Sequence, residues 1–273
     1  MPELPEVETI VRDLRPKLVG RRLAAVRRGD KALRRHWDAA WEKELAGRRV
    51  RAVDRRGKWI VLYLDAGVHL VVHLGMTGQL KVVPTAAELE PHTHLVFDLE
   101  RRREQLRFRD IRRFGSATVF GGKEAVQAFF DESGLGPEPW SVEVRYWRER
   151  LAGTRRSLKA VLLDQRVVAG VGNIYADESL FEAKLRPTRL GCELKSKDAD
   201  RLRKAVVAVL ERAIDKRGSS IRDYVGGSGL QGGYQREFRV YGQDGKPCPR
   251  CRQPIALIRL AGRATHYCPK CQS

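Results

Sequence analysis

The chain has 273 residues, a length typical of one large domain or of two to three small ones. Lysine and arginine total 53 against 34 aspartates and glutamates, and the net charge of +19 favours a polyanion as partner. A ribosomal or merely arginine-rich protein is the alternative. No run of about 18 apolar residues occurs, and the acidic N-terminus lacks the apolar core of a signal peptide. We therefore expect no membrane span and a cytoplasmic protein.

The first half of the chain is predicted to form one helix followed by short strands. The helix runs roughly from Glu3 to Leu18 and is closed by Gly20. Period-two alternation then predicts eight strands separated by glycine and proline: Arg22–Arg28, Arg49–Val53, Trp59–Leu64, His69–Leu74, Gln79–Val83, His94–Leu99, Gln105–Arg109 and Ser116–Phe120. A short helix is predicted over Lys123–Phe130. Eight short strands with turn signals between them indicate a β-sandwich.

The second half is predicted to be mainly helical, after a linker over Gly134–Pro139. Helices are predicted over Ser141–Leu151, Ser157–Asp164, Ile174–Ala183 and an amphipathic segment whose apolar residues run from Leu202 to Ile214, ending at Gly218. The glycine-rich stretch Val225–Tyr234 is expected to be a mobile loop. Ala256–Leu260 and Thr265–Tyr267 are predicted to pair as a hairpin. The fold class is thus α+β and multi-domain. The predicted parts are 1–133, a linker with the first helix at 134–153, a helical domain at 154–235 with a loop at 218–235, and 236–273.

The N-terminal segment places a proline beside acidic residues. Removal of Met1, usual before a small second residue, would leave Pro2 as a secondary amine. The pKa of an α-amino group is about 7.7–8.0, against about 10.4 for lysine. A useful fraction of the α-amino groups is therefore neutral and nucleophilic at physiological pH. Glu3 and Glu6 would supply carboxylates for proton transfer. The alternative is an ordinary helix start, where proline and glutamate are both favoured, and the two interpretations are compatible.

Four of the five cysteines are grouped near the C-terminus. They form two C-x2-C pairs separated by sixteen residues: Cys248, Cys251, Cys268 and Cys271. This spacing predicts one structural Zn²⁺ bound by four thiolates, with no open position for catalysis. Disulfides are the alternative, which a reducing compartment disfavours. Cys192 stands alone and is expected to be structural or merely tolerated.

Two glycine-containing segments are candidates for contacts with a nucleic acid. Gly170–Asn173 lies between two predicted helices, where backbone N–H groups at a helix start can bind a phosphate oxygen. Arg155 and Lys159 lie nearby in the sequence. Asp110–Gly115 joins two predicted strands, and its arginine and aromatic residue could enter a base stack beside an extruded nucleotide. Ordinary turns with exposed arginines beside a core phenylalanine are the alternative.

Four further residues have a functional and an ordinary interpretation. Lys58 could approach a sugar or a phosphate, or could be a solvated lysine at a strand end. His73 and Met76 flank a turn, where a lone histidine is more often structural and a methionine more often part of a core. Arg263 is predicted at the tip of the hairpin, where it could contact phosphates or be one more exposed charge.

Taken together, these motifs resemble the formamidopyrimidine-DNA glycosylase family, the bacterial base-excision repair enzymes for oxidised purines. The resemblance covers essentially the whole chain and rests on Pro2–Thr9, His73–Gly78, Arg112–Gly115, Gly170–Ala176 and the four cysteines. It implies an N-terminal β-sandwich, a helix–two-turns–helix domain and a zinc finger, with DNA crossing the cleft between the domains. The partner it implies is double-stranded DNA with a damaged base or an abasic site. We expect a monomer in the bacterial cytoplasm, associated with the nucleoid while it scans DNA.

The resemblance also assigns roles to catalytic residues. It implies that Pro2 is the Schiff-base nucleophile at C1′ and that Glu3 gives and takes the proton. Glu6 would order the active site, Lys58 would assist at the sugar-phosphate, and Arg263 would assist the later elimination. The implied activity is that of a bifunctional DNA glycosylase and AP lyase acting on 8-oxoguanine and formamidopyrimidines by β,δ-elimination.

The DNA contacts implied by the resemblance include residues that fill the void after the lesion is flipped out. Met76, Arg112 and Phe114 match this set. His92, Arg112, Asn173 and a basic residue near Arg155 match DNA contacts, and we add His73 and Lys159 as candidates. The chain departs from the family at Ile111, where proline is often found, and at Thr154-Arg155-Arg156, where the contacting residue is open by one position. The stretch Val225–Tyr234 matches the loop that closes over the damaged base.

Three alternatives remain at the level of sequence. A non-catalytic lesion-binding paralogue would not need Pro2, Glu3 and Lys58 together, and all three are present. An enzyme of the endonuclease VIII type would act on oxidised pyrimidines. The set Met76, Arg112 and Phe114 argues for the purine branch. A zinc-ribbon protein associated with RNA or ribosomes would explain the charge but leave the N-terminal motif without a reason.

Overall fold

The structure is a computed structural model, and it describes residues 1–29, 31–33, 35–101, 103–219 and 232–273. The chain divides into two compact units, each described here by itself. The first contains residues 1–133 and 217–232, and the second contains residues 134–216 and 233–273. The segment that follows the last long helix thus packs with the N-terminal unit, and the C-terminal cysteines pack with the helical unit.

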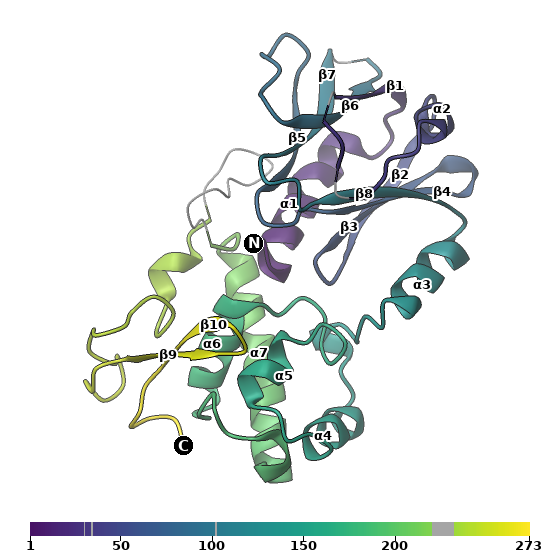
Figure 1. Ribbon diagram of the computed structural model, residues 1–273. Coiled ribbons are helices and arrows are strands. Elements are labelled where there is room, and N and C mark those ends of the chain that lie inside the picture. The colour runs from purple at the N-terminus through teal and green to yellow at the C-terminus, as the bar shows by residue number, and fades with distance from the viewer. Residues whose placement is uncertain (30, 34, 102, 220–231) are drawn as a thin grey trace. The chain divides into compact units, whose positions relative to one another are not determined.

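The first unit is a sandwich of two antiparallel four-stranded sheets (Figure 1). The strands of one sheet follow in the order β1 (Leu23–Arg28), β6 (Thr93–Leu99), β7 (Glu104–Asp110) and β5 (Gly78–Pro84). Those of the other are β2 (Val50–Arg56), β3 (Trp59–Leu64), β4 (Val68–His73) and β8 (Ser116–Gly121). The helices are α1 (Leu4–Leu18), α2 (Ala40–Leu45) and α3 (Lys123–Glu132), with a 3₁₀ turn at Asp65–Gly67.

Helix α1 contributes a continuous apolar face to the core of the sandwich. Val7, Ile10, Leu14 and Leu18 recur at helical spacing and are all fully or almost fully buried. The helix contacts β2 and β3 of one sheet and β5 of the other. Buried residues of α1 and of both sheets belong to one hydrophobic cluster. The N-terminal turn of α1 is therefore held rigidly by the core.

The second unit is helical and ends in a two-stranded hairpin. Its helices are α4 (Val144–Ala152), α5 (Leu158–Leu163), α6 (Asn173–Glu182) and α7 (Ser196–Asp215), with 3₁₀ turns at Pro139–Ser141, Gly191–Glu193 and Tyr234–Glu237. Strands β9 (Ala256–Leu260) and β10 (Arg263–Tyr267) pair antiparallel. Helix α6 is buried along almost its whole length and contacts α5, α7 and β10. It is the central element of this unit.

The predicted fold class is confirmed, and all eight predicted strands of the sandwich are present within a few residues of their expected bounds. Helix α2 was not predicted. Helix α4 begins at Val144, because Pro139–Ser141 forms a separate 3₁₀ turn. Helix α7 begins at Ser196, ahead of the predicted apolar stripe. The predicted loop at Val225–Tyr234 falls largely outside the described residues.

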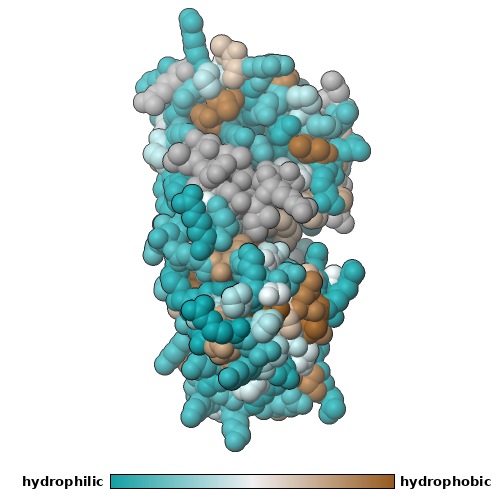
Figure 2. Space-filling model, turned by 90° about the vertical axis from the view of Figure 1, so that its left-hand side faces the viewer, coloured by the Kyte–Doolittle hydropathy of each residue, from teal (hydrophilic) through white to brown (hydrophobic). Residues whose placement is uncertain are grey.

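The described surface is polar, as the charge of the chain suggests. Figure 2 shows one face that is mostly hydrophilic, with hydrophobic residues scattered over it in small groups. None of the helices in the described ranges combines the length and the apolar character that crossing a membrane requires.

Candidate active site and nucleic-acid interface

Two buried glutamates, Glu3 and Glu6, follow Pro2 at the start of α1. Glu3 and Glu6 are only 3% and 2% exposed. They form a reciprocal capping box, in which the backbone N–H of Glu3 donates to Glu6 Oε2 at 2.9 Å. Pro2 is buried as well, whereas Met1 is exposed. Pro2, Glu3 and Glu6 therefore form the start of the helix, and their catalytic roles stay a prediction.

Glu6 is also bound by a segment more than two hundred residues away in the sequence. Its Oε1 accepts hydrogen bonds from the backbone N–H and the hydroxyl of Ser219, at 2.7 and 3.0 Å. Gly218 precedes Ser219 with φ of +72°, and a Cβ there would come within 2.8 Å of Glu6 Oε1. Arg217 binds Asp13 of α1 in the same region. Both oxygens of Glu6 thus accept hydrogen bonds, and the carboxylate is fixed in place.

Lys58 lies in the turn between β2 and β3 and is 6% exposed. The next residue, Trp59, pairs across the sheet with His73 at the end of β4, and their ring centroids are 4.6 Å apart. Burial, followed by the charges of Lys58 and Arg35, lowers the pKa of His73 to about 4. His73 is therefore neutral at physiological pH. Its Nδ1 accepts from the N–H of Gly75 at 3.1 Å, which leaves Nε2 as the donor.

The predicted void-filling residues lie on two neighbouring loops of the first unit. Met76 is on the turn between β4 and β5, and Arg112 and Phe114 are on the loop between β7 and β8. Met76 is 37% exposed and Phe114 is 42% exposed. The guanidinium of Arg112 lies 4.8 Å from the centroid of the Phe114 ring. The structure thus places the three residues on adjacent loops, and their insertion into DNA stays a prediction.

His92 lies on the segment that precedes β6 and adopts a φ of +66°. Its carbonyl oxygen accepts from the N–H of Asp110, the residue that begins the loop of Arg112. His92 is partly exposed. The structure therefore brings His92 to the base of the loop that carries Arg112, and the DNA contacts of both residues stay predictions.

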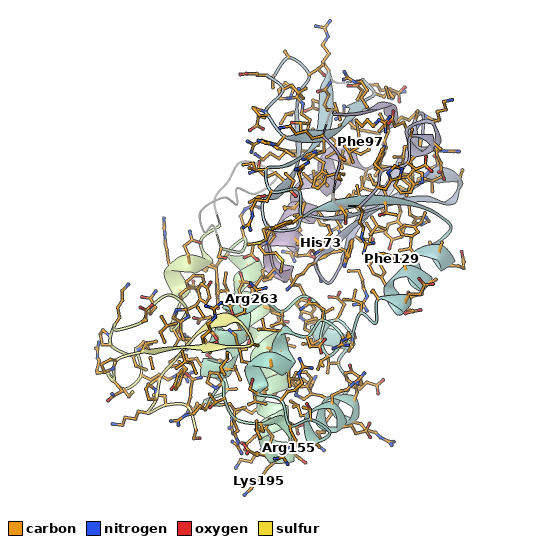
Figure 3. The ribbon with its side chains drawn as sticks, viewed as in Figure 1. His73, Phe97, Phe129, Arg155, Lys195 and Arg263 are labelled. Atoms are coloured by element: carbon orange, nitrogen blue, oxygen red, sulfur yellow. The ribbon has the colours of Figure 1, made fainter. Side chains whose placement is uncertain are left out.

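In the second unit, Asn173 and Arg263 are brought together. The Asn173 side chain, at the first residue of α6, donates to the carbonyl of Ala264 at 3.0 Å. Arg263 is the preceding residue and begins β10 (Figure 3). The turn itself is formed by Ala261 and Gly262, both with positive φ, as a two-residue hairpin requires. Arg263 therefore flanks the tip of the hairpin rather than occupying it.

Lys159 has a different role from the predicted DNA contact. Its side chain is 0% exposed, and its ammonium group binds the carboxylate of Asp177 and the carbonyl of Asn173. The other oxygen of Asp177 accepts from the backbone N–H of His266 on β10 at 3.0 Å. A phosphate cannot reach this ammonium without disrupting the pair. Lys159 instead fixes the start of α6 and, through Asp177, strand β10.

Arg155 is exposed and precedes α5. Figure 3 places it toward the opposite end of the second unit from Arg263. The neighbouring Arg156 is engaged by Asp164, at 2.7 Å, and by the carbonyl of Ala160. Both arginines are exposed, but the guanidinium of Arg156 is held by Asp164 and Ala160, so Arg155 is the better candidate for a phosphate contact.

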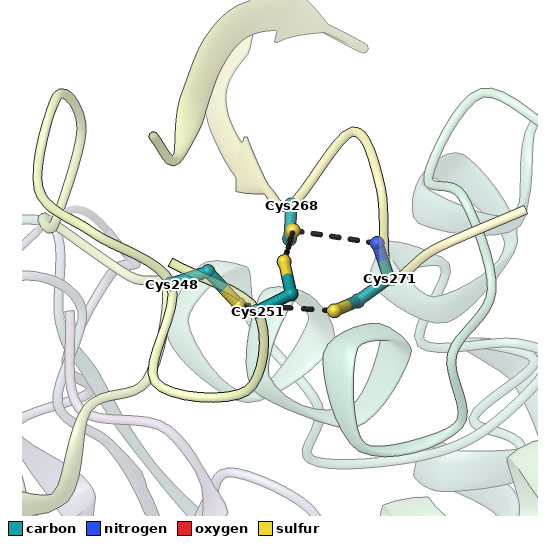
Figure 4. A group of neighbouring side chains, drawn as sticks. All are labelled: Cys248, Cys251, Cys268 and Cys271. Atoms are coloured by element: carbon teal, nitrogen blue, oxygen red, sulfur yellow. Dashed lines mark hydrogen bonds between the residues drawn. The ribbon is translucent and has the colours of Figure 1, made fainter. Parts of the chain in front are cut away.

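The four C-terminal cysteines converge on one point (Figure 4). Their sulfur atoms all lie within 4.8 Å of one another. Cys251 Sγ is 3.4 Å from Cys268 Sγ, and Cys248 Sγ is 3.9 Å from Cys271 Sγ. Zn–S bonds of about 2.3 Å in a tetrahedron place the sulfurs about 3.8 Å apart, so the set fits Zn²⁺. All four are thiols and not disulfides.

The thiols are held by the protein in a way that suits a metal. Backbone N–H groups of Arg250 and Cys271 point to the sulfurs of Cys248 and Cys268, at 3.4 and 3.3 Å. Cys248 and Cys268 pack with Phe181 of α6. The protein has one structural zinc site, which joins the C-terminal segment to the helical unit.

Sequence reasoning missed several residues that organise these sites. Ser219 carried no motif, and only the fold brings it to Glu6. Asp110 belongs to the segment that was singled out, but no role was predicted for it. Asp177 and Glu178 follow the motif at the start of α6 and are both buried. Charged residues among the apolar positions of a helix were the available signal.

Comparisons with known proteins agree along the chain. Residues 1–117 match the family described as formamidopyrimidine-DNA glycosylase N-terminal domain, and residues 135–225 match the H2TH domain of the same glycosylase. Residues 245–273 match the zinc finger found in FPG and IleRS. The formamidopyrimidine-DNA glycosylase of Geobacillus kaustophilus is 45% identical over 276 residues, which cover all of both chains. That of Thermus thermophilus is 45% identical over 277 residues, 100% of this chain and 98% of the relative.

Solved structures give the same result. A Lactococcus lactis FPG mutant in complex with Fapy-dG-containing DNA superimposes with a TM-score of 0.93 at 34% identity, over 99% of each chain. A MutM complex with DNA that contains carbocyclic 8-oxo-G has a TM-score of 0.91, also at 34% identity and 99% coverage of both chains. The two matching glycosylase domains span most of the chain, and full-length relatives share well over 30% of its residues. The chain belongs to the formamidopyrimidine-DNA glycosylase family.

Proposed function

We propose that this DNA glycosylase excises oxidised purines, 8-oxoguanine and formamidopyrimidines, from duplex DNA and then cleaves the strand as an AP lyase. The observation that carries the proposal is the buried pair Glu3 and Glu6, which follows Pro2 in the chain, with Glu6 fixed by three hydrogen bonds. The choice of substrate is supported by family membership and by solved relatives that are complexes with DNA containing Fapy-dG, carbocyclic 8-oxo-G or an abasic site.

In the proposed reaction, Pro2 becomes the N-terminal residue once Met1 is removed. Its neutral secondary amine attacks C1′ of the flipped nucleotide, and the bond from C1′ to the base breaks. Glu3 supplies the proton that the sugar oxygen or the departing base requires, and later accepts protons in the lyase steps. Glu6 keeps Glu3 and the proline nitrogen in register through its bond to the Glu3 N–H.

The resulting iminium makes the C2′ protons acidic. Loss of a C2′ proton expels the 3′-phosphate by β-elimination, and a second elimination expels the 5′-phosphate, which leaves a one-nucleotide gap. Hydrolysis of the imine with one water releases the sugar fragment and restores the amine. Lys58, the neutral His73 and Arg263 are the basic or donor groups proposed to bind the phosphates in these steps. No redox step is required.

Recognition in this proposal has an electrostatic and a mechanical part. The net charge of +19 supplies attraction to the phosphates, which weakens steeply with salt. Met76, Arg112 and Phe114 fill the space that the flipped nucleotide leaves in the stack. The four-part domain division and the lesion loop at 218–235 remain predictions, and the loop falls mostly outside the described residues.

The test is borohydride trapping on a duplex that carries 8-oxoguanine opposite cytosine. A covalent adduct mapped to residue 2 is expected for the native chain and lost in Pro2→Gly. Glu3→Gln should strongly reduce base release. Glu124→Gln, which replaces an exposed glutamate on α3, is the matched control and should act like the native chain.

Two results would contradict the proposal. Tight binding of the lesion duplex without an adduct or cleavage would make the protein a lesion-binding paralogue. Efficient action on oxidised pyrimidines, with none on 8-oxoguanine, would make it an enzyme of the endonuclease VIII type.

A further inference from the structure

The void-filling surface consists of Met76, Arg112 and Phe114. Asp110 lies where the two loops that carry these residues meet. It is the last residue of β7, pairs with Gly78 of β5 and is 0% exposed. Met76 is two residues before its strand partner, and Arg112 is two residues after Asp110 itself. A buried carboxylate is thus placed directly beneath the exposed residues that are proposed to enter the DNA.

Both oxygens of the Asp110 carboxylate accept hydrogen bonds from these loops. Oδ1 accepts from the Thr77 hydroxyl at 2.5 Å and from the backbone N–H of Arg112 at 3.2 Å. Oδ2 accepts from the N–H of Gly115 at 2.7 Å. The Thr77 oxygen in turn accepts from the N–H of Arg112 at 3.1 Å. One side chain therefore joins the turn of Met76 to both ends of the loop that carries Arg112 and Phe114.

The backbone of Asp110 is held as firmly as its side chain. Its N–H donates to the carbonyl of His92 at 3.0 Å, and its carbonyl accepts from the N–H of Arg113 at 3.3 Å. The same carbonyl lies 2.9 Å from Nε2 of His94, whose Nδ1 lies 2.9 Å from the carbonyl of Lys31. His94 is 2% exposed. The backbone of Asp110 is therefore held by its strand pairing with β5 and by hydrogen bonds with His92, Arg113 and His94, in addition to the loop contacts of its carboxylate.

The turn of Met76 and the loop of Arg112 and Phe114 are in close contact at Gly75 and Gly115. A Cβ on Gly75, which has φ of +61°, would come within 2.5 Å of the backbone of Phe114 and Gly115. A Cβ on Gly115 would come within 2.8 Å of the His73 carbonyl. The backbones are in direct contact, so a displacement of one loop is transmitted to the other.

We propose that Asp110, acting with Thr77, is the positioning residue that holds Met76, Arg112 and Phe114 as one rigid wedge. The inference rests on the proposed function, because the wedge acts only where a nucleotide leaves the stack. Unstacking costs a few kcal/mol, and a wedge that is already ordered does not lose conformational freedom when it enters. Misplacement by about 1 Å can cost about 100-fold in rate, so a loosened wedge is expected to slow the reaction although it touches no reacting atom.

The test compares a lesion that must be extruded with one that is already unpaired. One duplex carries 8-oxoguanine opposite cytosine, and the other carries an abasic site in a one-nucleotide bulge. Asp110→Asn is expected to lower kcat/KM by about 10- to 100-fold on the paired lesion and by less than about 3-fold on the bulge. Thr77→Val should show the same selectivity to a smaller degree, and Thr77→Ser, which keeps the hydroxyl, should restore it. Asp54→Asn, at an exposed aspartate of β2, is the control.

A measurement without chemistry separates this inference from the proposed function. A duplex with a tetrahydrofuran abasic analogue carries 2-aminopurine in the opposite strand. The fluorescence of 2-aminopurine is expected to increase when the wedge enters the base stack. The native chain and Thr77→Ser should give the same increase, and Asp110→Asn and Thr77→Val a smaller one. If the native chain shows this increase but cleaves no substrate, the proposed function fails and the inference stands.

Two results would overturn the inference. Equal proportional losses on the paired and the bulged duplex would show that Asp110 only supports the fold. If Asp110→Asn does not fold, the Thr77 variants decide. Thr77→Val with native fluorescence and native kcat/KM on the paired lesion would show that the wedge does not depend on this hydrogen-bond network.

Discussion

Glu6, in the first turn of α1, accepts two hydrogen bonds from Ser219, which follows the last long helix. The bonds are 2.7 and 3.0 Å long and join residues 213 positions apart. Ser219 itself is only 3% exposed. The carboxylate of Glu6 is therefore fixed by the segment that follows α7. Because Glu6 also binds the N–H of Glu3, a change that displaces this segment is expected to displace Glu3 as well.

Gly218→Ala tests this relationship. The φ of +72° costs a residue with a Cβ about 1–2 kcal/mol, and the Cβ would lie 2.8 Å from Glu6 Oε1, an overlap that adds about 1–3 kcal/mol. We expect a loss of stability in urea unfolding together with a loss of base excision. Gly20→Ala is the matched control, because φ there is +86° but nothing lies within 4 Å. If both variants lose the same stability and retain activity, Glu6 does not depend on this segment.

Loss of one zinc ligand should unfold the C-terminal segment. In Cys251→Ser we expect less than one zinc per chain by atomic absorption and a large loss of DNA affinity, because a structural site contributes its binding free energy to folding. Cys192→Ser replaces the exposed cysteine outside the cluster and should retain both zinc and affinity. Full affinity in a zinc-free Cys251→Ser protein would show that the finger is dispensable for binding.

Lys159 and Arg155 should behave in opposite ways. Lys159→Met leaves Asp177 buried without its cation, and breaking such a pair costs about 3–5 kcal/mol of stability. Arg155→Gln changes an exposed side chain, so its stability should stay within about 0.5 kcal/mol. If Arg155 binds a phosphate, the slope of log K against log salt becomes less negative by about 0.9 in this variant. An unchanged slope would remove Arg155 from the DNA contacts.

The sequence predicted the structure correctly where an element is determined by a local residue pattern. The eight strands follow period-two alternation between turn residues, and the spacing of the two C-x2-C pairs predicted the zinc site. Helix α2 was missed because only Leu45 of its six residues is buried, so it has no apolar stripe to reveal it. The bounds of α4 were displaced because Pro139-Trp140-Ser141 begins a 3₁₀ turn with the same composition as a helix start.

The site residues that were missed depend on tertiary structure. Lys159 was taken for a surface cation because lysine is seldom fully buried, and its partner Asp177 lies 18 residues away on another helix. Ser219 reaches Glu6 only after the chain returns to the first unit. Asp110 was within a recognised segment, but its hydrogen bonds to Thr77 and Gly115 depend on the pairing of β5 with β7. Such contacts have no signature in a single sequence.

His73 should make the stability of the first unit depend on acid pH. Its pKa is lowered from 6.5 to about 4, chiefly by burial and then by Lys58 and Arg35, so the fold favours the neutral ring. Between these values the unfolded chain binds a proton that the folded chain does not. The stability from His73 is therefore full above about pH 6.5 and is lost as the pH falls toward 4, by at most about 3 kcal/mol.

His73→Gln removes this proton-linked term. We expect urea unfolding to show that the free energy of unfolding of the variant, minus that of the native chain, is larger at pH 4.5 than at pH 7.5. His36→Gln, at an exposed histidine of the same unit, controls for the removal of one histidine. A difference between His73→Gln and the native chain that does not change with pH would show that the ring is not held neutral. It would also remove the reason for treating Nε2 of His73 as a neutral donor toward a phosphate.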